Sequence, residues 1–198
     1  MSVKPVTLAG RRINLVPLMQ SHADDLLTSA EHDEVWTYLD EPTPTTPEMI
    51  HALVREALEE QAAGARIPFG IINRDSNRAI GSISYIDIQP GNRALELGWA
   101  WLSPNYWKTG IAREAAYLLI RHAFEDLDAV RVVMKTDARN VRSQDAISGL
   151  GAVREGLFRR HRILRDGHQR DSVFYSLIRE DWDAARDDLA TQLRINCL

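Results

Sequence analysis

Cysteine is almost absent from this chain, since Cys197, close to the C-terminal end, is the only one in 198 residues. A single cysteine can form no internal disulfide, which fits a reducing compartment. Long apolar runs are absent too: no stretch is long enough to span a bilayer, and residues 1–5 begin no apolar signal region. We therefore expect a soluble cytoplasmic protein without a membrane partner.

An excess of charge of one sign is also missing. The 24 basic and 28 acidic residues give a net charge of -4, so no overall field attracts nucleic acid or an anionic membrane. The six histidines show no metal-ligand spacing, and with one cysteine we expect no zinc or other metal site. The Gly-x-Gly-x-x-Gly motif is absent, which argues against a Rossmann-type nucleotide-binding module.

What the chain does have is enough apolar content for one core. At 44% apolar residues, a chain of this length can bury a sizeable interior, and it contains no internal repeat or low-complexity segment. We predict a single domain over residues 1–198.

Apolar periodicity in the first half predicts strands interrupted by two helices. Ser21 is the expected N-cap of the first helix, and Thr46 with Pro47 opens the second, which should stop at Gly64. Short turns join the last three strands of this half, which should therefore form an antiparallel meander. The strands are expected over residues 12–16, 68–72, 79–86 and 94–102.

The second half predicts a parallel crossover followed by a hairpin. A helix from Gly110 leads to a strand over 130–136, which should pair in parallel with the 94–102 strand. The closing amphipathic helix packs on the sheet or on a second subunit. The other expected elements are a helix opened by Asn140, hairpin strands over 152–164 and 170–178 across Asp166-Gly167, and that closing helix over 180–193. The fold class is α/β, a mixed sheet with helices on it.

The turn between the 94–102 strand and its helix could hold a phosphate. The first N–H groups of the helix lack intrahelical acceptors and carry the positive end of its macrodipole. Gly110 lets the backbone come close to a ligand, and Lys108 adds positive charge. A plain loop would look the same over these two residues, so the flanking sequence decides.

Those flanks resemble the GNAT N-acetyltransferases. Residues 107–112 are similar to the pyrophosphate loop of that family, Gln/Arg-x-x-Gly-x-Gly/Ala, but Trp107 stands at the first position. An aromatic-Trp pair there, Tyr106-Trp107, is similar to the RimJ/RimL branch. Further motifs of the branch follow its order: Leu-x-Gly-Arg-x-x-x-Leu-x-Pro-Leu from Leu8, Glu96-Leu97-Gly98-Trp99, Asn-x-x-Ser from Asn140 to Ser143, and Leu150-Gly151-Ala152.

The resemblance implies the GNAT fold and acetyl-CoA, hence coenzyme A, as cosubstrate. In that fold the sheet is mixed and mostly antiparallel with helices on both faces, and a bulge, indicated here by Gly98, splays the central parallel strands to admit pantetheine. The cofactor-binding residues that the resemblance implies are the main chain at Trp101 and Leu102, the loop residues Trp107, Lys108, Thr109, Gly110, Ile111 and Ala112, and then Asn140 and Ser143.

Two side chains are candidates for catalysis. Glu96 lies between apolar neighbours, where desolvation would raise its pKa and suit it as general base, although alternation could equally point it to solvent or into an ion pair. Ser143 matches the proposed acid of the RimL-like branch, although a serine at a helix start needs no such role. Many GNAT enzymes have a tyrosine where Ile147 stands, and Tyr175 is the second candidate hydroxyl.

The sequence thus indicates an acyl-CoA-dependent N-acyltransferase. With no cysteine placed to carry the acyl group, transfer to a primary amine should occur by direct attack in a ternary complex. The acceptor is a protein N-terminus or a small amine. A non-catalytic CoA-binding or scaffolding protein with a GNAT fold is the alternative.

Two charged surfaces remain without an assigned role. Acidic side chains on and between the first two helices could attract a cationic amine or simply form a solvated face. The basic stretch from Arg159 to Arg170 could serve a subunit contact, an acidic acceptor or the outer phosphates of CoA. No nucleic-acid motif accompanies it, so we expect no nucleic-acid partner, and a homodimer is possible.

Overall fold

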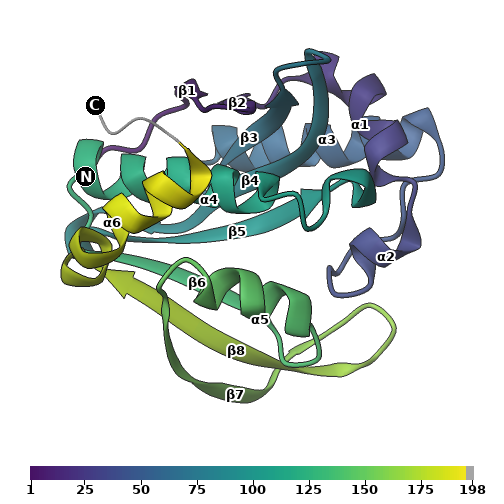
Figure 1. Cartoon of the computed structure of the whole chain (residues 1–198). Helices are drawn as coiled ribbons and strands as arrows, with labels where there is room; N and C mark the ends of the chain where they lie inside the picture. Colours follow the sequence, from purple (N-terminus) through teal and green to yellow (C-terminus); the bar gives the residue numbers. More distant parts are fainter. Residues whose placement is uncertain (195–198) are drawn as a thin grey trace.

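The computed structural model describes residues 1–194, and Cys197 lies outside them. A single sheet runs through the described molecule with helices on both faces (Figure 1). Its strand order is β1-β2-β3-β4-β5-β6-β8-β7, in which β5 and β6 are the one parallel pair among the described strands. The strands are β1 (Leu8–Ala9), β2 (Ile13–Pro17), β3 (Arg66–Asn73), β4 (Arg78–Gln89), β5 (Ala94–Leu102), β6 (Arg131–Asp137), β7 (Val153–Ile163) and β8 (Gln169–Ile178).

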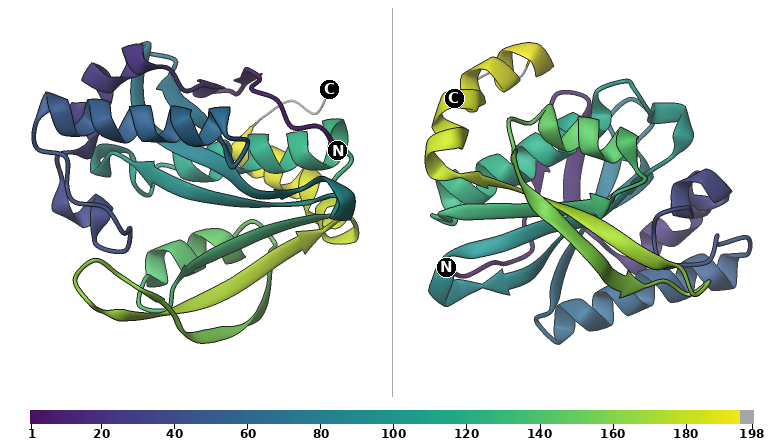
Figure 2. Two further views of the ribbon diagram at one scale, coloured as in Figure 1. Left: turned by 180° about the vertical axis from the view of Figure 1, so that it is seen from behind. Right: turned by 90° about the horizontal axis from the view of Figure 1, so that it is seen from below.

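The helices divide between the two faces of the sheet. Figure 2 shows α4, α5 and α6 on one face and α1 and α3 on the other. No helix within residues 1–194 is long and apolar enough to cross a membrane. The helices are α1 (Ala23–Ala30), α2 (Asp33–Trp36), α3 (Pro47–Ala62), α4 (Ile111–Arg121), α5 (Val141–Ser148) and α6 (Arg179–Leu193).

The larger core lies between the sheet and α4. Tyr85 of β4 is fully buried in it, and its hydroxyl donates to the Leu119 carbonyl at 2.5 Å. The closing helix α6 packs on the same side, because its fully buried Trp182 meets Tyr117 at 5.4 Å and Phe124 at 6.0 Å between ring centroids. The predicted amphipathic helix therefore covers the protein's own core.

The predicted antiparallel meander of β3, β4 and β5 is confirmed. Of the two helix caps predicted in this half of the chain, one is confirmed and one is wrong. Thr46 caps α3 as expected, since its hydroxyl accepts the Met49 N–H at 3.4 Å. Ser21, in contrast, is not an N-cap: it lies inside a single 3₁₀ turn, Gln20–His22, that runs directly into α1. The Gln20 carbonyl of that turn accepts the N–H of Ala23, the first residue of the helix, without a side-chain cap.

The central strands separate where the resemblance expects them to. β5 and β6 pair over three positions only, from Ala94 opposite Arg131 to Glu96 opposite Val133, and then diverge (Figure 1). Beyond Glu96, β5 contains a bulge. Gly98 pairs with Ser84 and Trp101 pairs with Ser82, so β5 has one more residue than β4 between these two pairs. Trp99, inside the bulge, takes a left-handed φ of 47°. The bulge next to Gly98 and the splayed parallel strands are thus confirmed.

Candidate active site

The loop before α4 presents unpaired N–H groups. Lys108 and Gly110 have left-handed φ angles of 61° and 88°, a conformation that Gly110 adopts without steric cost. The Thr109 hydroxyl donates to the Tyr106 carbonyl at 2.7 Å, which tightens the loop. Within the described residues, the next two N–H groups of the helix after Ile111 have no acceptor. The loop can therefore donate to an anion at the helix N-terminus.

A buried ion pair, missed by the sequence analysis, fixes this loop to the first strands. Glu114 is fully buried and accepts from the Arg12 backbone N–H at 2.9 Å and from its Nε at 3.2 Å. The Arg12 Nη1 then donates to the Thr109 carbonyl at 2.7 Å. The sequence signal for this ion pair was a carboxylate, Glu114, on the apolar face of the α4 helix. Its partner could not be identified from the sequence, because Arg12 lies 102 residues earlier in the chain.

Trp107, the residue that departs from the family loop, points inward. Its indole Nε1 donates to the Leu102 carbonyl at 2.8 Å, so one of the two lone pairs of this main-chain oxygen is used. The guanidinium carbon of Arg142 lies 3.4 Å from the centroid of the indole ring. Trp107 thereby connects the end of β5 to the first turn of α5.

A second core lies between the sheet and the helices α1, α2 and α3, and it contains Trp101, the residue that follows the bulge. Trp101 is only 7% exposed and meets Trp36 of α2 at 5.3 Å between ring centroids. The half-buried Trp99 stacks under the guanidinium of Arg66, 4.9 Å from its ring centroid. Trp101 is therefore a core residue, and Trp99 packs against Arg66.

Glu96 lies at the point where β5 and β6 part. It is 4% exposed, and its Oε2 is 2.6 Å from the Nζ of Lys135 on β6. Burial raises the pKa of Glu96 above its ordinary value, although the hydrogen bond from Lys135 acts in the opposite direction. The carboxylate is therefore both buried and ion-paired, rather than directed to solvent.

The first turn of α5 carries Asn140 and Ser143. The Asn140 Oδ1 accepts the Ser143 N–H at 3.1 Å, so Asn140 is an N-cap. The hydroxyl of Ser143 forms no hydrogen bond within residues 1–194. Tyr175, by comparison, is 3% exposed, and its hydroxyl donates to the Gln144 amide oxygen at 3.3 Å. Of the two candidate hydroxyls, Ser143 is the one without a protein partner.

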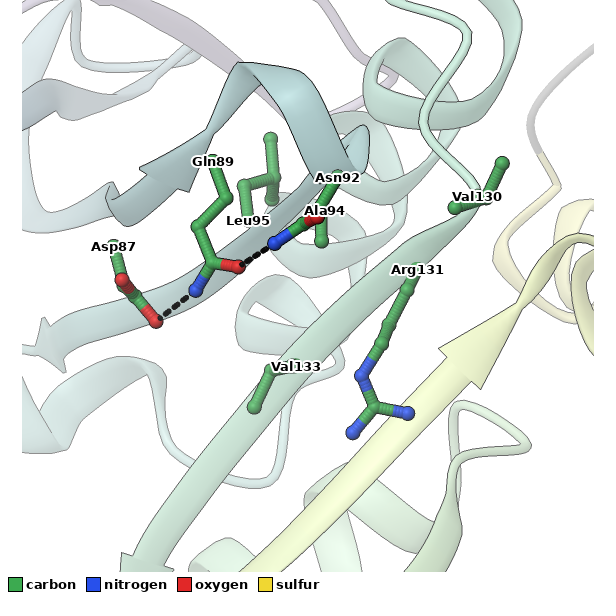
Figure 3. Close-up of a pocket in the computed structure, with 8 residues that line it drawn as sticks. All are labelled: Asp87, Gln89, Asn92, Ala94, Leu95, Val130, Arg131 and Val133. Atoms are coloured by element: carbon green, nitrogen blue, oxygen red, sulfur yellow. Dashed lines mark hydrogen bonds between the residues drawn. The ribbon is translucent and has the colours of Figure 1, made fainter.

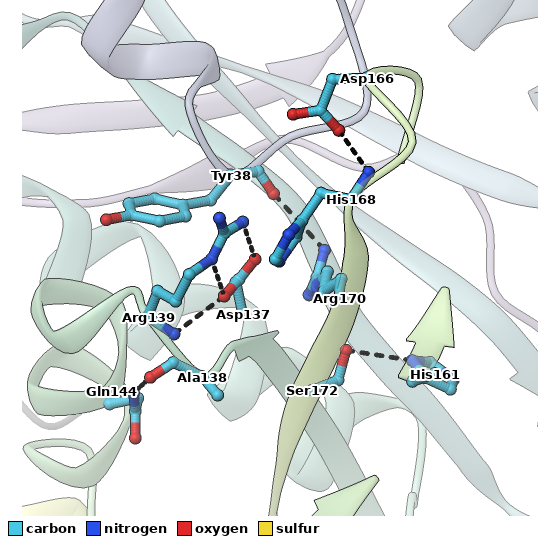
Figure 4. Close-up of polar contacts among 10 residues, drawn as sticks. All are labelled: Tyr38, Asp137, Ala138, Arg139, Gln144, His161, Asp166, His168, Arg170 and Ser172. Atoms are coloured by element: carbon cyan, nitrogen blue, oxygen red, sulfur yellow. Dashed lines mark hydrogen bonds and ion pairs between the residues drawn. The ribbon is translucent and has the colours of Figure 1, made fainter. Parts of the chain in front are cut away.

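A second carboxylate shapes the turn that leads to Asn140 (Figure 4). Asp137 is 1% exposed and accepts from the Arg139 backbone N–H at 2.8 Å and from its Nη2 at 2.7 Å. Arg170 on β8 donates to the carbonyl of Tyr38 at 3.4 Å, which joins the segment after α2 to the sheet. These contacts were not predicted, because they depend on a local turn or connect residues far apart in the sequence.

Within residues 1–194, the structure contains two cavities, one of them at the paired ends of β5 and β6. One of about 290 Å³ lies where β5 and β6 are still paired, and its lining includes Leu95 and Val133, next to and opposite Glu96 (Figure 3). The other, of about 230 Å³, lies between the segment after α2 and the β7–β8 turn. Its acidic lining residues are Asp33, Asp40, Glu41 and Asp166.

Comparisons with known proteins point to a single family. The family described as "Acetyltransferase (GNAT) domain" matches residues 12–153. The uncharacterized N-acetyltransferase YnaD of Bacillus subtilis (strain 168) is 29% identical over 115 residues, which are 58% of this chain and 66% of that relative.

Solved structures agree over almost the whole length. A protein from T. thermophilus assigned as an acetyltransferase is 38% identical, with a TM-score of 0.88 over 98% of this chain and 100% of that one. RimL, a ribosomal L7/L12 alpha-N-protein acetyltransferase, reaches a TM-score of 0.77 at 23% identity, over 90% of this chain and 97% of that one. The second likeness shows the fold alone.

Proposed function

Because the chain belongs to the GNAT acetyltransferase family and is an N-acetyltransferase, we propose that it transfers an acetyl group from acetyl-CoA to a primary amine by direct attack. The observation that carries the proposal is the loop before α4, which contains Lys108 and leads into N–H groups of the first helical turn that have no acceptor within residues 1–194. These groups suit the diphosphate of CoA. When bound, acetyl-CoA supplies the thioester, and the parting of β5 and β6 suits its pantetheine arm.

Glu96 is the proposed general base. The amine must lose a proton before it can attack, and a buried carboxylate with a raised pKa is a good acceptor near neutral pH. The hydrogen bond from Lys135 lowers that pKa against the larger effect of burial. Proton transfer is direct or through one water.

Ser143 is the proposed acid for the leaving thiolate. Its hydroxyl is free of protein partners within residues 1–194, whereas that of Tyr175 is engaged by Gln144. The main chain at Trp101 and the amide of Asn140 are proposed to bind the pantetheine arm. The carbonyl of Leu102, already bound to Trp107, is the weakest member of the predicted cofactor set.

The acceptor is proposed to be a protein N-terminal amine or a small amine. The first choice follows the RimJ/RimL resemblance and the shared fold of RimL, which by itself does not determine substrate. The acidic lining of the 230 Å³ cavity would favour a cationic acceptor. The cytoplasmic location and the homodimer stay predictions.

Thiol release from acetyl-CoA, measured over a panel of N-terminal peptides and small amines, tests the proposal. We expect turnover on one acceptor class. With that acceptor, Ser143→Ala should lower kcat on the order of 10²-fold, the usual contribution of a general acid, whereas Tyr175→Phe should stay near wild type. Tight CoA binding without turnover on any amine would favour the non-catalytic alternative.

A further inference from the structure

Arg142 is held beside the loop without a hydrogen-bonding partner of its own. Its guanidinium carbon lies 3.4 Å from the Trp107 ring centroid, whereas the other cation–π pairs of the described residues are 4.9 to 5.8 Å apart. Within residues 1–194, Arg142 makes no hydrogen bond and no ion pair. All five guanidinium N–H donors are therefore available to a ligand.

The stacking geometry favours a phosphate. A guanidinium that lies over an indole uses its face for the ring and keeps its edge free, and that edge matches two phosphate oxygens. Trp107 is itself fixed by its hydrogen bond to Leu102, so the platform under Arg142 is rigid. The platform belongs to the loop that begins α4, where the unpaired N–H groups lie.

Trp107, on whose ring Arg142 lies, stands at the first position of the loop before α4. In the family pattern, the first residue of the loop is Gln or Arg, a side chain able to donate to phosphate, whereas the single donor of the Trp107 side chain is already used for the Leu102 carbonyl. Within the described structure, a cation from α5 instead lies directly on the ring of the substituting residue. Within residues 1–194, no carboxylate forms an ion pair with this cation.

We infer that Arg142, stacked on Trp107, binds the diphosphate of the CoA cosubstrate in place of the polar side chain that the loop lacks at its first position. The inference rests on the proposed function and deepens it, because it names a binding residue outside the loop.

Calorimetric titration of the full chain with CoA, dephospho-CoA and pantetheine tests the inference. Arg142→Gln should raise the Kd for CoA and for dephospho-CoA by ~10- to 100-fold, the loss expected for charge-assisted hydrogen bonds. The Kd for pantetheine, which carries no phosphate, should not change. Arg142→Lys keeps the charge without the planar fork. Its Kd for CoA and for dephospho-CoA should lie between the values of wild type and of Arg142→Gln.

A matched control removes an arginine elsewhere. Arg154 is exposed on β7 and has no ion pair among the described residues, so Arg154→Gln should bind all three ligands as wild type does. Equal weakening of CoA and pantetheine in Arg142→Gln would overturn the inference, because it would indicate a structural role. If Arg142→Gln bound CoA more weakly but dephospho-CoA as tightly as wild type, Arg142 would contact the 3′-phosphate. That result would overturn the diphosphate assignment. Wild type that bound no CoA would overturn the proposed function itself.

Discussion

Glu96 shows how one residue can satisfy two expectations that looked exclusive. Its neighbours in β5 are apolar, and burial raises its pKa; yet it also forms an ion pair, with Lys135 on the adjacent strand. The apolar neighbours Leu95 and Leu97 suggested a desolvated carboxylate, while alternation left an exposed or ion-paired side chain open. The sequence did not predict the lysine, because Lys135 lies 39 residues further along the chain.

The ion pair leads to a pH prediction. A base must be deprotonated, so kcat/KM should fall as the pH falls through the pKa of Glu96. Lys135 lowers that pKa against the effect of burial. Lys135→Met should therefore move the acid limb of the kcat/KM profile to higher pH, and Lys135→Arg should leave it nearly in place. An acid limb unmoved by Lys135→Met would remove Glu96 as the titrating group.

Asp137 gives a stability prediction. Although burial raises the pKa of Asp137, its hydrogen bonds from Arg139 outweigh that effect and hold the pKa below the ordinary value. The stabilisation is therefore present above the unfolded-state pKa and is lost as pH falls through the folded-state pKa. Asp137→Asn should lower the free energy of unfolding at neutral pH on the order of 1 kcal/mol.

The pH dependence of that loss is the check. Urea unfolding of both proteins at several pH values should show the difference shrinking on the acid side, where the wild-type carboxyl is also protonated. A difference that stayed constant down to the most acid pH would contradict the assigned charge effect.

At the scale of elements, the regular strands and helices were predictable and the short ones were not. β3, β4, β5 and α3 were found close to their bounds, because their apolar periods extend over several repeats. α2 and β1 contain four and two residues, too few to display a period. Ser21 failed as a cap because it lies inside a 3₁₀ turn whose Gln20 carbonyl accepts the N–H of Ala23, and no sequence pattern predicts that turn.

The packing of β1 and β2 against α4 gives another prediction. A Cβ at Gly10 would lie 2.5 Å from the Glu114 Oε1 and 2.8 Å from the Ile13 carbonyl oxygen, whereas a Cβ at Gly156 would meet nothing within 4 Å. Gly10→Ala should therefore destabilise the fold by about 1–3 kcal/mol. Because Arg12 and Glu114 position the loop, the same change should also weaken CoA binding.

Gly156→Ala serves as the matched control, since it adds the same methyl group in open space. Thermal unfolding and CoA titration of both variants should separate them. Equal behaviour of the two variants would show that the Gly10 contact does not support the loop.

At the scale of the whole molecule, the site is made by segments that the sequence keeps apart. β5, the α4 loop and α5 meet around the parting of the sheet, and Arg142 reaches Trp107 across 35 positions of the chain. The sequence indicated these segments one by one through the resemblance. Their mutual contacts, and the pairs formed by Glu114 and Asp137, required the folded chain because each depends on a distant partner or on a turn.

The rate of thiol release from acetyl-CoA with the best amine acceptor, wild type beside Glu96→Gln, tests the central claim most directly. The substitution keeps the shape of the side chain and removes its basicity. We expect kcat/KM to fall by ~10²-fold or more, as for other general bases, with the Kd for CoA unchanged. Activity close to wild type in Glu96→Gln would contradict the assignment of Glu96 as the base in a direct transfer.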